Sequence, residues 1–314
     1  MLTYAEVKDK PVVFRSFTSL DVAEFEQLLP AFSQAWQRYV EQEFVEGKER
    51  QRQPGGGRKP TLATMEDKLL FILFYLKTYP LQEVIAFLFG MSQGQANVWI
   101  HRLAQVLQMA LGIEGHLPER DGAQLAEALA EYDILEFAID GAERRRQRPK
   151  DKKEQKKYYS GKKKAHTVKN NVVVHTESRK VLYLSKTVEG KKHDKKLADE
   201  EGLTFPPWSV LFQDTGFQGF APDKVIVSQP KKKPRGKELT MGEKMMNRVI
   251  SSARIVVENV IAGIKRCRAA KDIFRNTKRK FDDLVMEIAC GLHNFRVESR
   301  SPQQQFTLTD FYFQ

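Results

Sequence analysis

Hydrophobic positions in the first third of the chain recur at helical spacing. Residues 18–46 mix apolar and polar side chains in the pattern of an amphipathic helix. The stretch RQRQPGGGRKP at 50–60 has the composition of a flexible basic linker. Three helices are then predicted in quick succession, over about 64–79, 81–89 and 92–111.

These three helices have recognisable boundary residues. Thr64 is placed to cap the first helix, Asp67 lies in its first turn, and Pro80 lies just past its end. Gly90 ends the short second helix, and the third opens on Ser92-Gln93-Gly94-Gln95, a Ser-x-x-Gln capping box. A helix, a short helix, a tight turn and a longer helix follow the order of a helix-turn-helix unit.

The third helix offers polar side chains for contacts with DNA and apolar ones for packing. The residues expected to face DNA are Gln93, Gln95, Asn97 and Arg102. The residues expected to pack inward are Val98, Leu103 and Leu107. The alternative is a helical domain that dimerises or supports the rest of the chain, and the acidic balance of residues 1–140 favours that alternative.

Beyond about residue 133 the period shortens to that of β-strands. The predicted strands cover residues 134–140, 164–178, 180–188, 208–214 and 224–230, and the predicted helices cover 193–201, 242–268 and 281–295. This order indicates an α/β fold with a mixed sheet and flanking helices, preceded by an all-α helix-turn-helix domain. The expected parts are a helical segment with the linker (1–60), the helix-turn-helix domain (61–115), the α/β domain (116–300) and a C-terminal tail (301–314).

Charge divides the chain into two unlike parts. The net charge is +12, yet residues 1–140 carry 13 Lys or Arg against 20 Asp or Glu, whereas residues 141–314 carry 39 against 20. A basic half is typical of a surface that binds nucleic acid or an anionic membrane. No apolar run approaches the ~20 residues of a membrane span, and the N-terminus lacks a signal-peptide core. Nucleic acid is therefore the expected partner, and the cytoplasm, near the nucleoid, is the expected location.

The number and spacing of the cysteines also favour an intracellular location. The chain has two cysteines, Cys267 and Cys290, and no CxxC pair. This is typical of a reducing compartment and argues against a cysteine-based zinc site. Cys267 lies on an apolar helix face and is expected to fill the core.

Two aspartates follow apolar strands and precede small residues. Asp140 ends ILEFAID, and Asp214 ends WSVLFQD. Carboxylates at the ends of neighbouring strands can converge, and a buried pair of like charges is unfavourable unless a cation neutralises it. Mg²⁺ binds carboxylates together with substrate phosphates, and two such ions support phosphodiester chemistry. Taken singly, each aspartate has an alternative role as an ordinary strand-end or turn residue.

The helix predicted over 242–268 supplies a third acid. Arg254, Glu258 and Lys265 fall within roughly 40° of one another at about 100° per residue. The apolar side expected to dock on the sheet comprises Val249, Val256, Val260 and Ile264. The alternative is a solvated helix with an Arg–Glu pair at i, i+4, which contributes only a few tenths of a kcal/mol.

Together these residues resemble the DDE transposases of bacterial insertion sequences, in the group related to the eukaryotic Harbinger elements. The resemblance rests on FAIDGAERR around the first acid, LFQDTGFQG around the second, and Arg-x3-Glu-x6-Lys on the long helix. Relatives often have Tyr three residues before that Arg, where this chain has Ser251. His193-Asp194 also resembles a His-Asp pair that these proteins carry after the third strand, and we treat it as accessory.

The resemblance implies an RNase H-like fold in which Asp140, Asp214 and Glu258 bind Mg²⁺, with Mn²⁺ as a substitute. It implies cleavage of double-stranded DNA at terminal inverted repeats and transfer of the 3′-hydroxyl end to target DNA, by a homodimer or larger assembly. It also implies that Arg254 and Lys265 position the helix or bind DNA phosphates.

Two basic stretches accompany the acids. Residues 144–164 hold twelve Lys or Arg against two acids, with Tyr158 and Tyr159 among them. We expect a hairpin extension there that becomes ordered on DNA, because cations bind phosphates and aromatic rings stack on bases. A solvated loop is the alternative. The second stretch, residues 231–237, should lie near the same site. The residues expected to bind phosphates are Arg144, Arg145, Arg146, Lys162, Lys163, Lys164, Lys231, Lys232 and Lys233.

Two other functions stay open. A DNA-binding regulator would keep the fold and lose the chemistry, and the intact set of three acids weighs against it. A stand-alone RNase H-like nuclease would cut branched or hybrid substrates without a helix-turn-helix domain or strand transfer. Metal-dependent nicking separates the regulator from a transposase, and joining of a 3′-hydroxyl end separates the stand-alone nuclease.

Overall fold

The structure is a computed structural model that describes residues 1–44, 60–233 and 238–300. Three features expected from the sequence therefore lie outside the described residues. These are the linker over 50–60 (Pro60 excepted), residues 234–237 of the second basic stretch, and the tail over 301–314.

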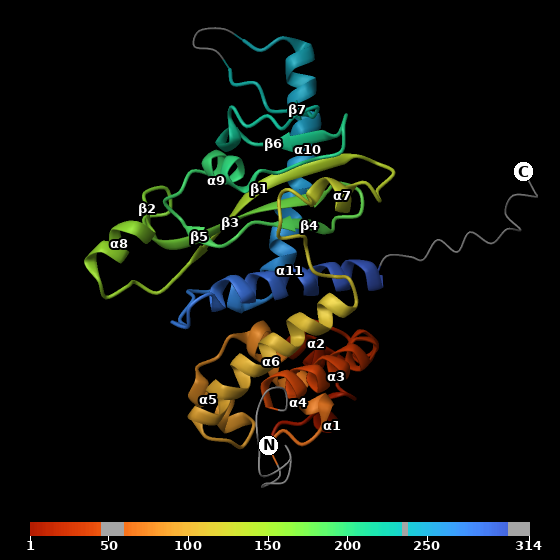
Figure 1. Ribbon diagram of the computed structural model, residues 1–314, viewed down its shortest axis with the longest axis vertical. Coiled ribbons are helices and arrows are strands. Elements are labelled where there is room, and N and C mark those ends of the chain that lie inside the picture. Colours follow the sequence, from red (N-terminus) through yellow and green to blue (C-terminus); the bar gives the residue numbers. More distant parts are fainter. Residues whose placement is uncertain (45–59, 234–237, 301–314) are drawn as a thin grey trace, which may run out of the picture.

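A helical lobe forms the N-terminal part of the chain, below an α/β lobe in Figure 1. Its helices are α1 (Tyr4–Val7), α2 (Pro11–Thr18), α3 (Val22–Phe44), α4 (Met65–Thr78), α5 (Gln82–Leu88) and α6 (Gln93–Ile113). The helix expected over 18–46 corresponds to α3. It begins later than expected because Ser19, at φ 65°, ends the separate helix α2 in a left-handed conformation.

Local capping places α4, α5 and α6 in the order that the sequence indicates. The Thr64 hydroxyl accepts the N–H of Asp67 at 3.1 Å and caps α4. Tyr79, at φ 47°, ends α4 just before Pro80. The capping box at the start of α6 is formed in both directions. The expected helix, short helix, turn and longer helix are therefore all present.

One face of α6 packs against the other helices of the lobe and against the α/β lobe. Leu103 and Leu107 are fully buried, as expected. Val98 is 45% exposed, so the prediction that it packs inward is wrong. The buried face is formed by Ala96, Ile100 and Leu103. Val98 lies about 200° from Ala96 around the helix and so points away from that face.

Within the described residues the α/β lobe is built on a seven-stranded sheet. Its strands are β1 (Glu136–Arg145), β2 (Tyr159–Ser160), β3 (Ala165–His175), β4 (Val181–Leu184), β5 (Val188–Glu189), β6 (Val210–Gln213) and β7 (Ile226–Ser228). The order is β2-β3-β1-β6-β7, with β4 and β5 also paired to β3. β3 is antiparallel to β1, whereas β6 is parallel to β1 and β7 to β6. The mixed, RNase H-like sheet expected from the sequence is confirmed.

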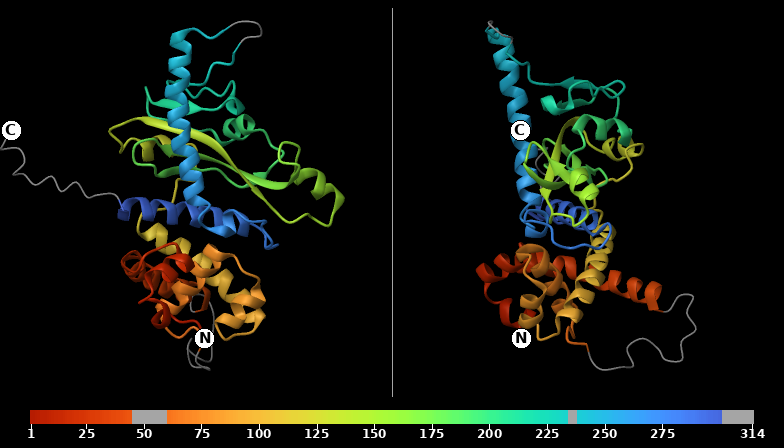
Figure 2. Two further views of the ribbon diagram at one scale, coloured as in Figure 1. Left: turned by 180° about the vertical axis from the view of Figure 1, so that it is seen from behind. Right: turned by 90° about the vertical axis from the view of Figure 1, so that its left-hand side faces the viewer.

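Helices cover both faces of this sheet (Figures 1 and 2). Alternate residues of β1 explain how, because successive side chains of a strand point to opposite faces. Ala138 and Ala142 pack with α10 (Met241–Ile264) and α11 (Phe281–Arg300), and Phe137 and Ile139 pack with α7 (Leu125–Leu129) and α9 (Asp194–Glu201).

α10 runs across the sheet, and its first turns project beyond it (Figure 1). Val260 and Ile264 dock on the core as expected, but Val249 is 52% exposed, so that part of the predicted docking face is wrong. Ile250 and Val257 are buried instead. Ile250 follows Val249 and lies about 100° further around the helix, so the buried face near the N-terminal end is rotated from the predicted one.

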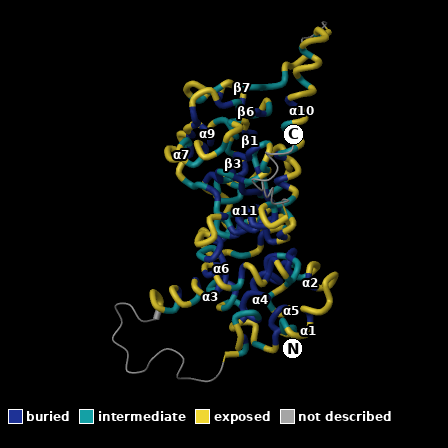
Figure 3. Tube along the Cα trace, turned by 90° about the vertical axis from the view of Figure 1, so that its right-hand side faces the viewer, coloured by how far each residue is buried: buried dark blue, intermediate teal, exposed yellow. Residues whose placement is uncertain are grey.

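A single hydrophobic core continues from the helical lobe through α11 into one face of the sheet (Figure 3). Cys267 and Cys290 lie in it as free, buried thiols, which confirms the expected role of Cys267 as core filler. None of the described helices is long and apolar enough to span a lipid bilayer.

Candidate active site

Asp140 and Asp214 lie side by side in the middle of the sheet. β1 and β6 are parallel, and Ile139 and Gln213 are the last pair of their ladder, so the two aspartates come next on adjacent strands. Asp214 also caps a short 3₁₀ turn by accepting the N–H of Gly216. The convergence that the sequence suggested is therefore present.

Asp140 does not end its strand, contrary to the prediction. β1 continues to Arg145 as an antiparallel partner of β3, with Asp140 opposite Val172. The apolar run that stops at Asp140 marks the end of the parallel ladder with β6. Beyond that point β6 no longer pairs with β1, and the outer end of β1 pairs with β3 and with the segment at Phe274.

Burial raises the pKa of Asp140 to about 6. The charges of Asp214 and Asp194 raise this pKa too, whereas the Gly141 N–H, 2.7 Å from Oδ1, and the charge of Arg254 lower it. The Asp140 carboxylate is thus poorly stabilised by the protein alone. An environment of this kind attracts a cation.

Asp194 is the third acid at this place, although its sequence pattern marked it only as accessory. It begins α9, and its Oδ1 lies 2.8 Å from Lys169 Nζ. A Cβ at Gly141 would lie 2.7 Å from Asp194 Oδ1, and one at Gly216 would lie 3.3 Å from Oδ2. The glycine after each aspartate therefore leaves room for the Asp194 carboxylate. The Asp-Gly and Asp-x-Gly spacings in the sequence indicated that a side chain is excluded at these positions, but they did not show that the neighbouring group is Asp194.

Glu258 lies apart from these acids, on the exposed side of α10. Its side chain is 59% exposed, and its Oε1 lies 3.6 Å from Arg254 Nη2. Arg254 in turn acts on Asp140. Across residues 1–44, 60–233 and 238–300, no group of three or more His, Cys, Asp or Glu is arranged to hold a metal ion. The structure thus brings Asp140 and Asp214 together and leaves Glu258 outside.

Lys265 approaches the acids from the C-terminal end of α10. Burial lowers its pKa, the charge of Lys163 lowers it as well, and the charge of Asp140 raises it. Lys265 therefore interacts electrostatically both with Asp140 and with the basic turn after β2 that contains Lys163. Lys163 itself lies at the outer end of the ribbon, because it precedes β3, whereas Asp140 pairs with Val172 well along that strand.

Comparison with known proteins agrees with this geometry. Residues 139–294 match the family described as "DDE superfamily endonuclease", and residues 60–112 match "Helix-turn-helix of DDE superfamily endonuclease". The chain belongs to the DDE endonuclease superfamily. It is 27% identical over 243 residues to the "Probable transposase for insertion sequence element IS702" of Microchaete diplosiphon, across 77% of this chain and 83% of that protein. No solved structure is significantly similar to it.

The basic insertion of this DDE endonuclease is a ribbon with a helix at its tip (Figure 1). β1 and β3 run together beyond the end of β6, and α8 (Lys152–Tyr158) and β2 complete the connection. Asp151 caps α8 through the N–H groups of Lys153 and Glu154. The expected hairpin extension is present, and Lys162, Lys163 and Lys164 are exposed in its return turn. Their contacts with DNA phosphates remain predictions.

The prediction that Arg144 binds DNA phosphates is wrong. This arginine is 4% exposed, and its guanidinium donates to Asn170 Oδ1 at 2.8 Å and to two further oxygens. It cannot contact DNA in this arrangement, because the alternation of β1 points it into the core. Arg145 points the other way and is exposed, and Arg146 stacks 4.0 Å from the ring centre of Tyr158.

The second basic stretch begins close to Asp214, as expected. The Gln229 side-chain amide donates to the backbone oxygen of Asp214 at 3.0 Å. Lys231 and Lys233 form ion pairs with glutamates near the start of α10, whereas Lys232 is exposed. Two of the three lysines are thus partly neutralised by the chain itself.

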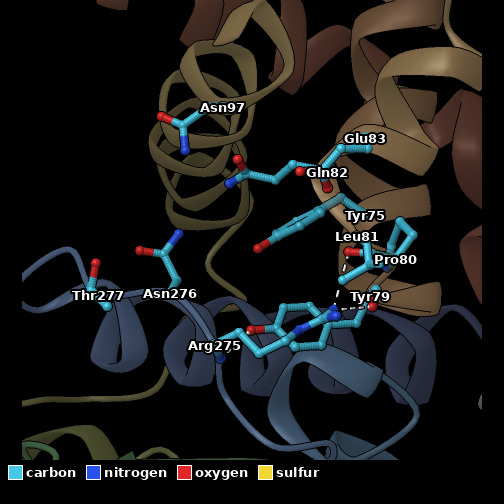
Figure 4. A pocket seen from close by; sticks show the side chains of 10 residues that line it. All are labelled: Tyr75, Tyr79, Pro80, Leu81, Gln82, Glu83, Asn97, Arg275, Asn276 and Thr277. Atoms are coloured by element: carbon cyan, nitrogen blue, oxygen red, sulfur yellow. Dashed lines mark hydrogen bonds between the residues drawn. The ribbon is translucent and has the colours of Figure 1, made fainter. Parts of the chain in front are cut away.

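The polar residues of α6 are largely engaged within the helical lobe. Gln93 donates at 2.5 Å to a glutamine of α5, and Gln95 completes the capping box. Asn97 lines a polar cavity of about 350 Å³ between α4, α5, α6 and residues 275–277 (Figure 4). Arg102 is half-buried. Their contact with DNA stays a prediction.

Arg275 joins the two lobes at the edge of this cavity (Figure 4). Its guanidinium donates to the backbone oxygen of Tyr79 at 2.6 Å and lies 4.4 Å from the ring centre of Tyr79. The preceding residue, Phe274, pairs with Arg146 at the base of the ribbon. One short segment therefore links the helix-turn-helix unit to the basic ribbon.

Proposed function

We propose that this DDE endonuclease is the transposase of a bacterial insertion sequence. It would cut double-stranded DNA at terminal inverted repeats and transfer the 3′-hydroxyl end to target DNA. The family and the similar protein support the transposase class. The observation that carries the reaction is the adjacent pair Asp140 and Asp214, placed next to each other by the parallel β1–β6 register.

Asp140, Asp214 and Glu258 are proposed as ligands of Mg²⁺, with Mn²⁺ able to replace it. Asp140 and Asp214 supply two adjacent carboxylates, the type of oxygen ligand that a hard divalent cation prefers. Glu258 would join them by turning away from Arg254. When bound, the ion would activate the attacking water or hydroxyl and stabilise the leaving oxygen.

The cations around the acids would hold the substrate backbone. Lys265 interacts with Asp140 and can bind a phosphate next to the scissile bond, and Lys163, which interacts with Lys265, can bind a phosphate further along the ribbon. Arg254 can take a DNA phosphate once Glu258 has turned away. Joining two element ends to one target requires at least two copies of the chain, so a homodimer or larger assembly on DNA is part of the proposal.

A nicking and strand-transfer assay tests this function. DNA carrying the element's ends is incubated with Mg²⁺, Mn²⁺ or a chelator, using wild type, Glu258→Gln and the control Glu127→Gln. Glu127 is an exposed acid on α7 and is not one of the three proposed ligands. We expect metal-dependent cutting and joining that Glu258→Gln abolishes and Glu127→Gln preserves.

A catalytically silent DNA-binding regulator is the second candidate. The Arg254–Glu258 pair favours it, because it keeps the third acid away from the other two. Tight DNA binding without any metal-dependent product in the same assay would support the regulator. Cleavage without joining of the 3′-hydroxyl end would instead support a stand-alone nuclease.

A further inference from the structure

A groove of about 760 Å³ lies at the end of the sheet opposite the basic ribbon. The C-terminal halves of α10 and α11 and the turn between β3 and β4 enclose it. Its arginines are Arg179, Arg266, Arg296 and Arg300. They come from three elements that are distant in sequence, so no basic run in the chain signals the cluster.

The positive charge of this arginine groove is only partly compensated. Arg300 forms a bidentate pair with the buried Glu24. Arg296 is 3% exposed and donates to the hydroxyl of Ser19 and to a backbone oxygen of α10. The charge of Arg266 lowers the pKa of Arg296, which shows that the two guanidinium groups repel each other. Among the described lining residues, Glu177 is the only acid.

The groove has the chemistry of a phosphate site. Arg179 and Arg266 are exposed, and guanidinium groups match phosphate oxygens with paired N–H donors. Asn259 and Ser178 add a neutral amide and a hydroxyl to the lining. His293 adds no charge at neutral pH, because burial lowers its pKa to about 4.

The distance to the acids suits a continuous duplex. Arg266 lies eight residues after Glu258, just past the C-terminal end of α10, which corresponds to a rise of roughly 12 Å at helical spacing. Glu177 lies five residues beyond Val172, which is opposite Asp140, or roughly 17 Å along the sheet. At 3.4 Å per base pair, these lengths correspond to about 4–5 base pairs of DNA.

We propose that the arginine groove binds backbone phosphates of duplex DNA a few base pairs from the scissile phosphate. The proposal rests on the proposed function in one respect, that duplex DNA is the substrate. The ribbon and the groove lie at opposite ends of β3, so DNA would be held on both sides of Asp140 and Asp214 (Figure 1). The contacts would be independent of base sequence.

A double variant tests the groove without disturbing the core. Arg179→Gln/Arg266→Gln removes two exposed arginines, and Arg15→Gln/Arg38→Gln removes two exposed arginines of the helical lobe as a matched control. Affinity for a long duplex of arbitrary sequence is measured against salt concentration in the presence of a chelator. We expect the slope of log K against log salt to flatten by about 0.9 for each lost contact, or about 1.8 in all. The control should leave the slope near that of wild type.

Equal slopes for the two double variants would overturn the proposal. A second outcome would also reject DNA as the ligand. In it, inorganic pyrophosphate raises the Tm of wild type but not of Arg179→Gln/Arg266→Gln, and the slope of log K against log salt for DNA is the same in both proteins. That outcome would assign the groove to a small phosphate ligand. Binding in chelator is measured independently of cleavage, so the two proposals can fail separately. If the double variant flattens the slope but wild type never nicks DNA in the presence of metal, the groove is supported and the transposase reaction is rejected. If wild type nicks DNA but the slope is unchanged in the double variant, the groove is rejected and the reaction is supported.

Discussion

Arg254 Nη2 lies 3.6 Å from Glu258 Oε1 on the outer side of α10. The same guanidinium lowers the pKa of Asp140, so one cation interacts with an acid of the helix and an acid of the sheet. For Glu258 to join Asp140 and Asp214, this pair must separate. The contact therefore couples the position of the third acid to the occupancy of the site.

Replacing Arg254 should lower the metal concentration that the enzyme needs. Arg254→Gln frees Glu258 and removes a positive charge close to the proposed cation. A partly exposed pair contributes up to about 1 kcal/mol, so the Mg²⁺ concentration for half-maximal nicking should fall by about threefold to fivefold. Metal titration of the nicking rate measures this. Arg248→Gln, another exposed arginine of α10, is the control, and an equal requirement in both variants would contradict the coupling.

Asp194 is expected to position the neighbouring acids. Asp194→Asn keeps the shape of the side chain but removes the charge that pairs with Lys169 at 2.8 Å. Losing such a supporting partner typically costs 10- to 100-fold in metal affinity or activity, so we expect a loss of about that size with DNA affinity unchanged. Single-turnover nicking across a Mn²⁺ series would show the loss. Asp199→Asn on the same helix should behave like wild type, and a normal Mn²⁺ dependence of Asp194→Asn would reject the role.

Gly141→Ala tests the same arrangement from the other side. The added Cβ would lie 2.7 Å from Asp194 Oδ1, which is too close for an ordinary contact. The carboxylate must move, so this variant should reproduce the defect of Asp194→Asn and lower the Tm. Combining Gly141→Ala with Asp194→Ala removes the clashing atoms, so the Tm of the double variant should equal that of Asp194→Ala alone, which already lacks the partner of Lys169. A Tm of the double variant below that of Asp194→Ala would mean that Gly141 is required for another reason.

Asp140 should make the metal-free protein less stable as the pH rises. Its pKa is raised to about 6 from an ordinary 3.8, so the folded state binds the proton more tightly than the unfolded state. The stability that this proton contributes is present below the ordinary pKa and is lost as the pH passes through about 6. Asp140→Asn lacks this dependence. After allowance for solvent screening, its stability advantage over wild type should grow by about 1–2 kcal/mol between about pH 4 and pH 8. Denaturant unfolding in chelator measures it, and parallel pH profiles would contradict it.

The basic turn should supply part of the salt dependence of DNA binding. Lys162, Lys163 and Lys164 are exposed, and Lys163 interacts electrostatically with Lys265. Neutralising the three to Gln should weaken binding and flatten the slope of log K against log salt by up to about 2.7. Anisotropy titrations at several salt concentrations test this. Lys8→Gln/Lys10→Gln/Arg15→Gln removes equal charge from the helical lobe, and identical slopes for the two triple variants would make the turn an ordinary solvated loop.

Local patterns in the sequence determined much of the fold. Capping at Thr64 and Ser92 sets the starts of α4 and α6, because these hydroxyls satisfy N–H groups of their own first turns. Period-two hydrophobicity identified the strands, and the order of elements indicated the mixed sheet. The acids Asp140 and Asp214 were recognisable because each follows a run of apolar residues and precedes a small residue. All of these signals act between residues close together in the chain.

Tertiary structure decided everything that depends on contacts between distant segments. Pairing with β3 extended β1 past Asp140 and buried Arg144. The docking of α10 turned Ile250 rather than Val249 toward the core, and the packing of α9 brought Asp194 to the glycines that follow the two aspartates. The arginine groove joins three remote elements in the same way. The hydrophobic pattern predicts which side chains are buried. Strand register and helix docking determine which buried side chains contact one another, and no signal between neighbouring residues in the sequence encodes those contacts.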